Sequence, residues 1–178
     1  MRFLKRLLVG IALLAAAFAV VVALQPDDYR LTRTIAIAAP AAQIFPHVND
    51  LRQWDAWSPW AKLDPAAKVS FAGPAAGQGA VFRWSGNDKI GEGSMTITES
   101  RPNERVRLRT DFVKPFEGTS DSEFVLSPQG DQTTVIWTMY GRNNFIAKAI
   151  CLFNSMEQMI GPDFEKGLLQ LRDLVEKK

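Results

Sequence analysis

The chain has 178 residues, 47% of them hydrophobic, which is enough for one globular domain with an appendage. Its formal net charge is +2, but residues 1–24 hold three basic side chains and no acid, so the remaining 18 basic and 19 acidic side chains leave the rest of the chain near −1. We therefore expect no nucleic-acid partner, and the single cysteine excludes an intrachain disulfide and a multi-cysteine metal site.

An uncharged apolar segment runs from Leu7 to Leu24. At 1.5 Å per residue it spans about 27 Å, close to the hydrocarbon thickness of a bilayer. Arg2, Lys5 and Arg6 precede it, so the positive-inside rule places the N-terminus in the cytoplasm and the domain on the far side. The sequence predicts a single-pass anchor in the inner (cytoplasmic) membrane over residues 1–24, with residues 25–178 forming a periplasmic domain.

A cleaved signal peptide is the rival interpretation of the same segment. Ala17-Phe18-Ala19 has the small-x-small form of a cleavage site. The apolar run continues beyond that site and is long for a signal peptide, which favours the anchor.

The region from residue 29 to 60 predicts one strand followed by short helices. Residues 29–38 alternate as a strand does, and a helix that contains Pro46 follows. Asp50 and Gln53 have the spacing of a capping box for a second helix. Trp54, Trp57 and Trp60 come next, either as indoles that close one end of the core or as an aromatic rim that grips a ligand.

Residues 68–141 predict six further strands joined by short turns. The clearest alternation lies in residues 105–112, where apolar side chains at even positions alternate with charged ones at odd positions. Short connections make neighbouring strands antiparallel. The pattern predicts one inward face: Phe71, Phe82, Trp84, Met95, Ile97, Leu108, Phe112, Phe124, Trp137 and Met139.

The C-terminal residues 144–178 predict a long amphipathic helix in two pieces. One apolar stripe runs from Ala149 through Phe153 to Val175, with Lys148 on the opposite, wet face. Pro162 interrupts the pattern, so we expect a piece near 145–160 and a second piece that starts at residues 161–162. The fold class is α+β, a seven-stranded antiparallel meander with the long helix on one face.

Catalytic signatures are absent from the sequence. The lone His47 has no second ligand for a metal, and no nucleophile elbow or phosphate loop occurs, so we expect no metal and no cofactor. Glu92 and Glu99 are acid–base candidates, and Cys151 reads as a quiet buried thiol. Arg101, Arg105, Arg107 and Arg109 form a basic stripe, either a solvated face or a contact for anionic headgroups.

Several stretches resemble the SRPBCC superfamily of START-like, birch-pollen-allergen-like helix-grip proteins, in its polyketide cyclase/dehydrase branch. They are Ala39-Pro40, Val48-Asn49-Asp50-Leu51, Trp54-x-x-Trp57-Ser58-Pro59-Trp60, residues 91–97 (GEGSMTI) and residues 161–168 (GPDFEKGL). The last two are similar to stretches of the membrane-anchored bacterial members. The resemblance covers residues 29–176 and implies a helix-grip fold with a hollow between the curved sheet and the C-terminal helix.

The function expected from this resemblance is exported, membrane-tethered binding of a hydrophobic small molecule or lipid in that hollow. The alternatives are a cyclase/dehydrase-type enzyme that uses Glu92, Glu99 or a hydroxyl group, and an interaction module with a filled core. The expected cavity residues are Trp57, Trp60, Phe82, Trp84, Met95, Thr110, Phe112, Ser122, Phe124, Trp137, Met139, Phe164 and Leu168.

Overall fold

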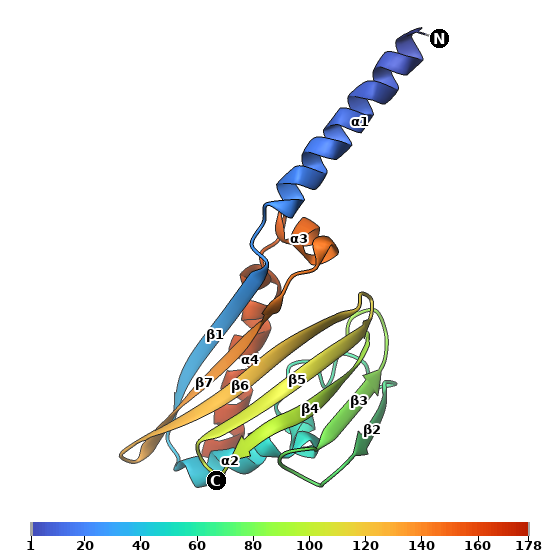
Figure 1. Ribbon diagram of the computed structural model, residues 1–178. Coiled ribbons are helices and arrows are strands. Elements are labelled where there is room, and N and C mark those ends of the chain that lie inside the picture. The colour runs from blue at the N-terminus through green and yellow to red at the C-terminus, as the bar shows by residue number, and fades with distance from the viewer. Residues whose placement is uncertain (1, 178) are drawn as a thin grey trace.

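The computed structural model describes residues 2–177, in which a curved sheet carries a long helix across one face and an apolar helix projects from the N-terminal end (Figure 1). The elements, in chain order, are α1 (Arg2–Ala23), β1 (Asp28–Ile37), α2 (Ala41–Asn49), the 3-10 helix η1 (Leu51–Ala56), β2 (Lys68–Ala72), β3 (Val81–Ser85), β4 (Glu92–Arg101), β5 (Arg105–Lys114), β6 (Gly118–Gln129), β7 (Gln132–Arg142), α3 (Phe145–Cys151) and α4 (Met156–Glu176).

The seven strands form one antiparallel sheet in the order β1-β7-β6-β5-β4-β3-β2. This confirms the predicted α+β class and the antiparallel pairing of neighbours. Hairpin connections build the meander from β2 to β7, and β1 joins it beside β7. Register shifts in the pairing of β4 with β5, between Glu92 and Gly93 and between Ile97 and Glu99, help to bend the sheet toward the helix.

The long helix starts earlier than the sequence predicted. α4 begins after Ser155, whose side chain accepts the backbone N–H of Gln158 while the Gln158 side chain accepts the backbone N–H of Ser155. This capping box determines the start, and Pro162 lies inside the helix instead of at its first position. The proline is tolerated because it leaves only the Gln158 carbonyl without its usual amide partner.

The apolar stripe of the C-terminal segment is also shorter than expected. Phe164, Leu168 and Leu171 of α4 are buried against the sheet, as predicted. Phe153, in the turn between α3 and α4, is 75% exposed, and Lys148, expected to be wet, is 9% exposed. The helical structure is interrupted at residues 152–155, between α3 and α4. The residues before this interruption therefore do not share the face that α4 presents to the sheet.

Two short helices close one end of the sheet. α2 buries Ile44 and Val48, and η1 follows with Asp50 as its cap, accepting the backbone N–H of Arg52. The sequence predicted Asp50 as the cap. The backbone N–H that it binds is that of Arg52 and not that of Gln53, whose side chain donates to the Asp50 carboxylate over 3.5 Å. Trp54 of η1 donates to the Val48 carbonyl oxygen over 3.2 Å, which ties the two helices together.

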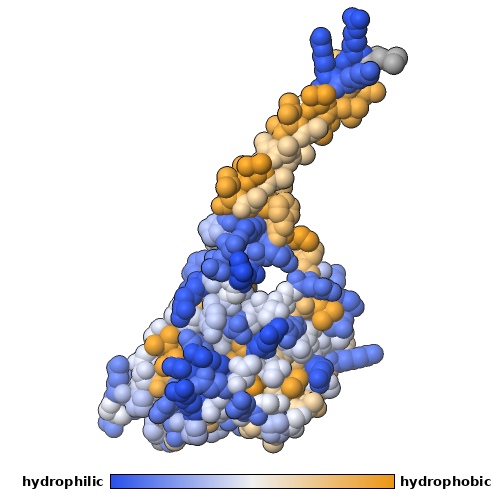
Figure 2. Space-filling view, in the orientation of Figure 1, coloured by the Kyte–Doolittle hydropathy of each residue, from blue (hydrophilic) through white to orange (hydrophobic). Residues whose placement is uncertain are grey.

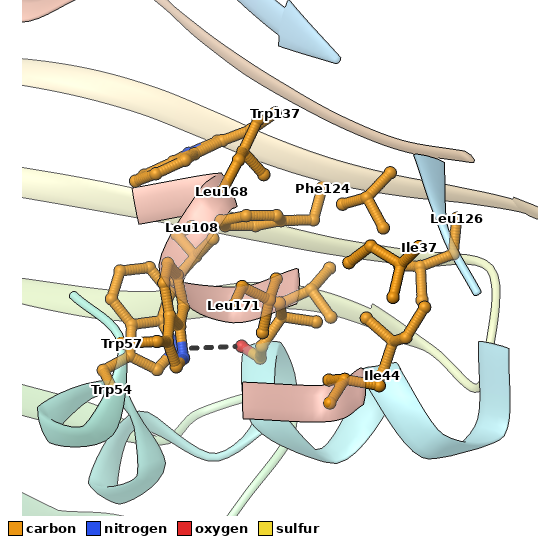
Figure 3. Close-up of a cluster of buried hydrophobic side chains, with 14 of the residues drawn as sticks. Ile37, Ile44, Trp54, Trp57, Leu108, Phe124, Leu126, Trp137, Leu168 and Leu171 are labelled. Carbon is orange, nitrogen blue, oxygen red and sulfur yellow. Dashed lines mark hydrogen bonds between the residues drawn. The ribbon is translucent and has the colours of Figure 1, made fainter. Parts of the chain in front are cut away.

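The half of the sheet nearest α2 is filled solidly. Figure 3 shows side chains from β1, α2, β5, β6 and α4 that point toward one another there, and all of those labelled are buried. The residues of this solid half that the view labels include Ile37, Ile44, Leu108, Phe124, Leu126 and Leu171. A filled core is therefore correct for this half of the domain.

The N-terminal helix α1 stands clear of the domain and is long and apolar enough to cross a membrane (Figures 1 and 2). Its C-terminal end meets α3, and Val22 is fully buried at that end. A short neck, residues 24–27, leads from α1 into β1.

Candidate functional site

A cavity of about 690 Å³ occupies the other half of the space between sheet and helix. Its walls come from the concave face of β2 to β7, from α4 and from η1 with the loop that follows it. The volume lies within the range of about 300–1,000 Å³ that is usual for small-molecule pockets.

Stacked aromatic rings form the boundary between the solid half and the hollow half. The rings of Trp137 and Phe164 are stacked with centroids 3.9 Å apart, and Phe124 stacks on Trp137 at 4.8 Å. Trp60 meets both Trp137 and Phe164 edge-on at about 6 Å. Of this group, Trp60, Trp137 and Phe164 face the cavity, and Phe124 lies behind them.

The structure brings ten of the thirteen expected residues to the cavity. They are Trp60, Phe82, Trp84, Met95, Thr110, Phe112, Ser122, Trp137, Met139 and Phe164. The other three, Trp57, Phe124 and Leu168, are buried in the solid half and do not line it. Alternation assigned Phe124 to the correct face of the sheet, but the position along the strand decides whether that face is packed or hollow.

The mouth of the cavity is made by loop residues that carry no periodic signal. Asp88, Lys89, Ile90 and Gly91 come from the turn before β4, Lys114 is the last residue of β5, and Pro115 begins the turn after it. Sequence reasoning missed these residues, as well as Arg52, Asp55 and Ser58 near η1, because alternation identifies strand faces only. Lys89, Lys114 and Pro115 are exposed, so the cavity borders the outside at these turns, as it also does at the exposed Val69 and Phe71 of β2.

Two buried polar atoms in the lining have no hydrogen-bond partner: the indole Nε1 of Trp137 and the hydroxyl Oγ of Ser120. Both residues are only 2% exposed. The Tyr29 hydroxyl lies near Ser120, and burial raises the pKa of Tyr29 while its interaction with Ser120 opposes that rise. Buried donors without partners are costly, so the Trp137 indole N–H is a group that an acceptor atom in the cavity would satisfy.

The two acid–base candidates do not reach the cavity. Glu92 pairs with Lys114 at 2.9 Å, and Glu99 pairs with Arg101 at 2.5 Å and Arg107 at 3.2 Å. Neither glutamate lines the cavity, whose carboxylates are the exposed Asp55 and Asp88. These glutamates therefore do not support the enzymatic alternative.

The basic residues and the histidine that the sequence singled out do not line the cavity either. In the basic stripe, Arg101, Arg107 and Arg109 are paired with neighbouring carboxylates, which favours a solvated face. His47 lies in the last turn of α2, away from the cavity. Among residues 2–177, no group of three or more histidine, cysteine, aspartate or glutamate side chains is placed to hold a metal ion.

Comparison with known proteins connects this geometry to a family. The chain matches the family described as polyketide cyclase / dehydrase and lipid transport over residues 28–176. No curated protein matches the sequence closely enough to count as a relative.

Several solved structures share the fold at low sequence identity. A protein from Chromobacterium violaceum is 18% identical, with a TM-score of 0.57 over 86% of this chain and 100% of its own. Ara h 8.0201 is 12% identical, with a TM-score of 0.60 over 85% of this chain and 99% of its own. The di-domain ARO/CYC protein BexL, from the BE-7585A biosynthetic pathway, is 17% identical, with a TM-score of 0.60 over 89% of this chain and 53% of its own.

These neighbours agree with the curved sheet, the gripped helix and the order of elements described above. The family match covers the whole of the sheet and all of α4. The chain therefore belongs to the polyketide cyclase / dehydrase and lipid transport family, within the SRPBCC superfamily of helix-grip proteins.

Proposed function

We propose that this protein is a membrane-tethered, exported carrier that holds a hydrophobic small molecule or lipid between the sheet and α4. The observation that carries the proposal is the 690 Å³ cavity, whose inner walls are almost entirely apolar. The family description, which includes lipid transport, supports the same ligand class.

The distribution of polar groups suits a ligand with a long apolar body and a neutral polar end. Charged side chains stand at the mouth, where Lys89 and Asp88 are exposed. The lining also offers the Trp137 indole N–H, which has no partner, and the Ser120 hydroxyl, whose register partner Gly141 is four residues from Trp137 along β7. A ligand oxygen that accepts from the indole would satisfy a donor that is otherwise buried unpaired.

The helix α1 supports the membrane tether. Its 22 residues span about 33 Å at 1.5 Å per residue, which matches the hydrocarbon core of a bilayer. Arg2, Lys5 and Arg6 lie at its N-terminal end, which favours a cytoplasmic N-terminus and a domain on the extracytoplasmic side.

Native mass spectrometry of the full chain, extracted from its host membrane into lipid nanodiscs, tests the proposal. We expect an additional mass that stays with the protein after the bulk lipid has been stripped away. Four tryptophans, Trp54, Trp60, Trp84 and Trp137, line the cavity, so a fluorescent fatty acid bound there should receive energy from them. A stripped, folded protein that neither retains a ligand nor shows this energy transfer would contradict the carrier function.

A further inference from the structure

Helix α3 is amphipathic in the reverse sense to a helix on a water-exposed surface. Phe145 and Ile146 at its start are 53% and 49% exposed, whereas Lys148 in the middle of the helix is only 9% exposed. A helix on the surface of a soluble domain places its lysine in water and its aromatic residue inward. The reversal indicates that the surroundings of this helix are apolar.

The inward lysine has a defined set of partners at the base of α1. Its ammonium group pairs with the Asp27 carboxylate and donates to the Ala23 carbonyl oxygen over 3.4 Å. Arg142 also contacts Asp27, at 3.1 Å. Because Ala23 is the last residue of α1, these bonds attach α3 to the end of the apolar helix and fix its position along the axis of that helix.

Two further exposed aromatic side chains lie in neighbouring segments. Phe153, in the turn after α3, is 75% exposed, and Phe116, in the turn between β5 and β6, is 51% exposed. Asn144, the cap of α3, donates to the Glu117 carbonyl oxygen over 3.2 Å and so joins that turn to α3. Figure 2 shows the hydrophobic surface of α1 continuing at its base, where α3 lies in Figure 1.

We propose that Phe116, Phe145, Ile146 and Phe153 form an interfacial foot that is inserted into the lipid surface around the base of α1. This inference rests on the proposed membrane tether. A bilayer is the occupant that fits, because the foot adjoins the end of a helix with the length and composition of a membrane span. Exposed aromatic residues are also typical of the boundary between headgroups and acyl chains.

The foot gives the cavity a route to its ligand. The turn that carries Phe116 supplies Pro115 to the cavity mouth, next to Lys114 at the end of β5. With the foot in the lipid surface, the mouth lies beside the bilayer, and an apolar ligand passes between membrane and cavity without crossing water.

Depth-dependent quenching in vesicles tests the foot on the full chain. Cys151 is replaced by serine, and a fluorophore is attached at Phe153→Cys in one sample and at Phe116→Cys in a second. The control label is placed at Asp131→Cys, in the exposed β6–β7 turn at the far end of the sheet (Figure 1). Each protein is reconstituted in phosphatidylcholine vesicles with or without bromine on the acyl chains, and uptake of a fluorescent fatty acid is measured in parallel samples.

We expect the brominated lipid to quench the labels at 153 and 116 and to leave the label at 131 unchanged. Quenching of both foot labels without fatty acid uptake would support the foot, and it would contradict only the carrier function. Fatty acid uptake with foot labels as bright as the control label would overturn the foot and leave the carrier function standing. The second label protects the test against a local folding defect caused by either substitution.

Discussion

Filling the cavity from its sheet wall is the most direct perturbation of the proposed binding site. Ser122 lies on β6, faces the cavity and pairs in register with Leu108 on one side and Met139 on the other. In Ser122→Phe, the added ring enters empty space, so we expect the fold to survive the change. Ser127→Phe is the matched control, because Ser127 is on the same strand but on the opposite parity and is half-buried on the outer face.

The magnitude of the effect on binding follows from the contact area lost. A ligand that buries about 300 Å² of apolar surface gains about 7 kcal/mol, before the entropic cost of binding, at ~25 cal/mol per Å². A phenyl ring that displaces roughly 100 Å² of this contact removes about 2.5 kcal/mol. Since 1.4 kcal/mol corresponds to a factor of ten in Kd, we expect about 60-fold weaker binding.

The assay is a titration of the stripped full chain with a fluorescent fatty acid, read by energy transfer from the cavity tryptophans. Circular dichroism and the unfolding temperature of both variants show whether each one is folded. The reasoning is refuted by a folded Ser122→Phe protein that binds as tightly as the parent, or by an equal loss of binding in Ser127→Phe.

Three other substitutions test the packing, the mouth and the neck. Phe164→Ala removes a buried ring that is stacked on Trp137, so we expect the free energy of unfolding to fall by about 3 kcal/mol. Urea unfolding followed by tryptophan emission measures this change. A decrease of less than about 1 kcal/mol would contradict the stacking. Gly91 has a φ of 64°, and an added Cβ would overlap the Lys114 carbonyl oxygen. We therefore expect Gly91→Ala to lower the free energy of unfolding by about 2 kcal/mol in the same assay. An unchanged unfolding midpoint would be inconsistent with this backbone conformation. Hydrogen bonding and charge attraction from Lys148, followed by Arg142, lower the pKa of Asp27 below 3.8, so its stabilising effect is present above that pH and is lost as the pH falls through the lowered value. Asp27→Asn should therefore melt at a lower temperature than the parent at neutral pH, and this difference should disappear in acid; a difference that persists in acid would show that the charge of Asp27 is not its cause.

The sequence was sufficient for the sheet because the central strands have one partly exposed face and one buried face. In β5, Val106, Leu108 and Thr110 are buried, and the charged residues between them are not, as alternation predicted. The start of α4 was missed, although the signal is present: Ser155 and Gln158 have the spacing of a capping box, which outweighs the proline six residues into the helix.

The cavity was predictable as a face of the sheet but not as a volume. Periodicity places Phe124 and Met139 on the same side, yet only Met139 faces the cavity. The difference depends on how far α4 and η1 lie from each point of the sheet, which is a property of the assembled fold. The buried Lys148 was not predictable from helical spacing, because its partner Asp27 is 121 positions away in the chain.

The shortness of the neck limits where the proposed tethered carrier could release its ligand. Four residues, 24–27, separate α1 from β1, and even a fully extended segment of this length reaches only about 14 Å. With Asp27 held by Lys148 and Arg142, the neck has little of that slack to use. If α1 spans a membrane as proposed, a domain held this closely cannot carry a ligand to an opposite membrane, and transfer takes place at the surface of its own membrane.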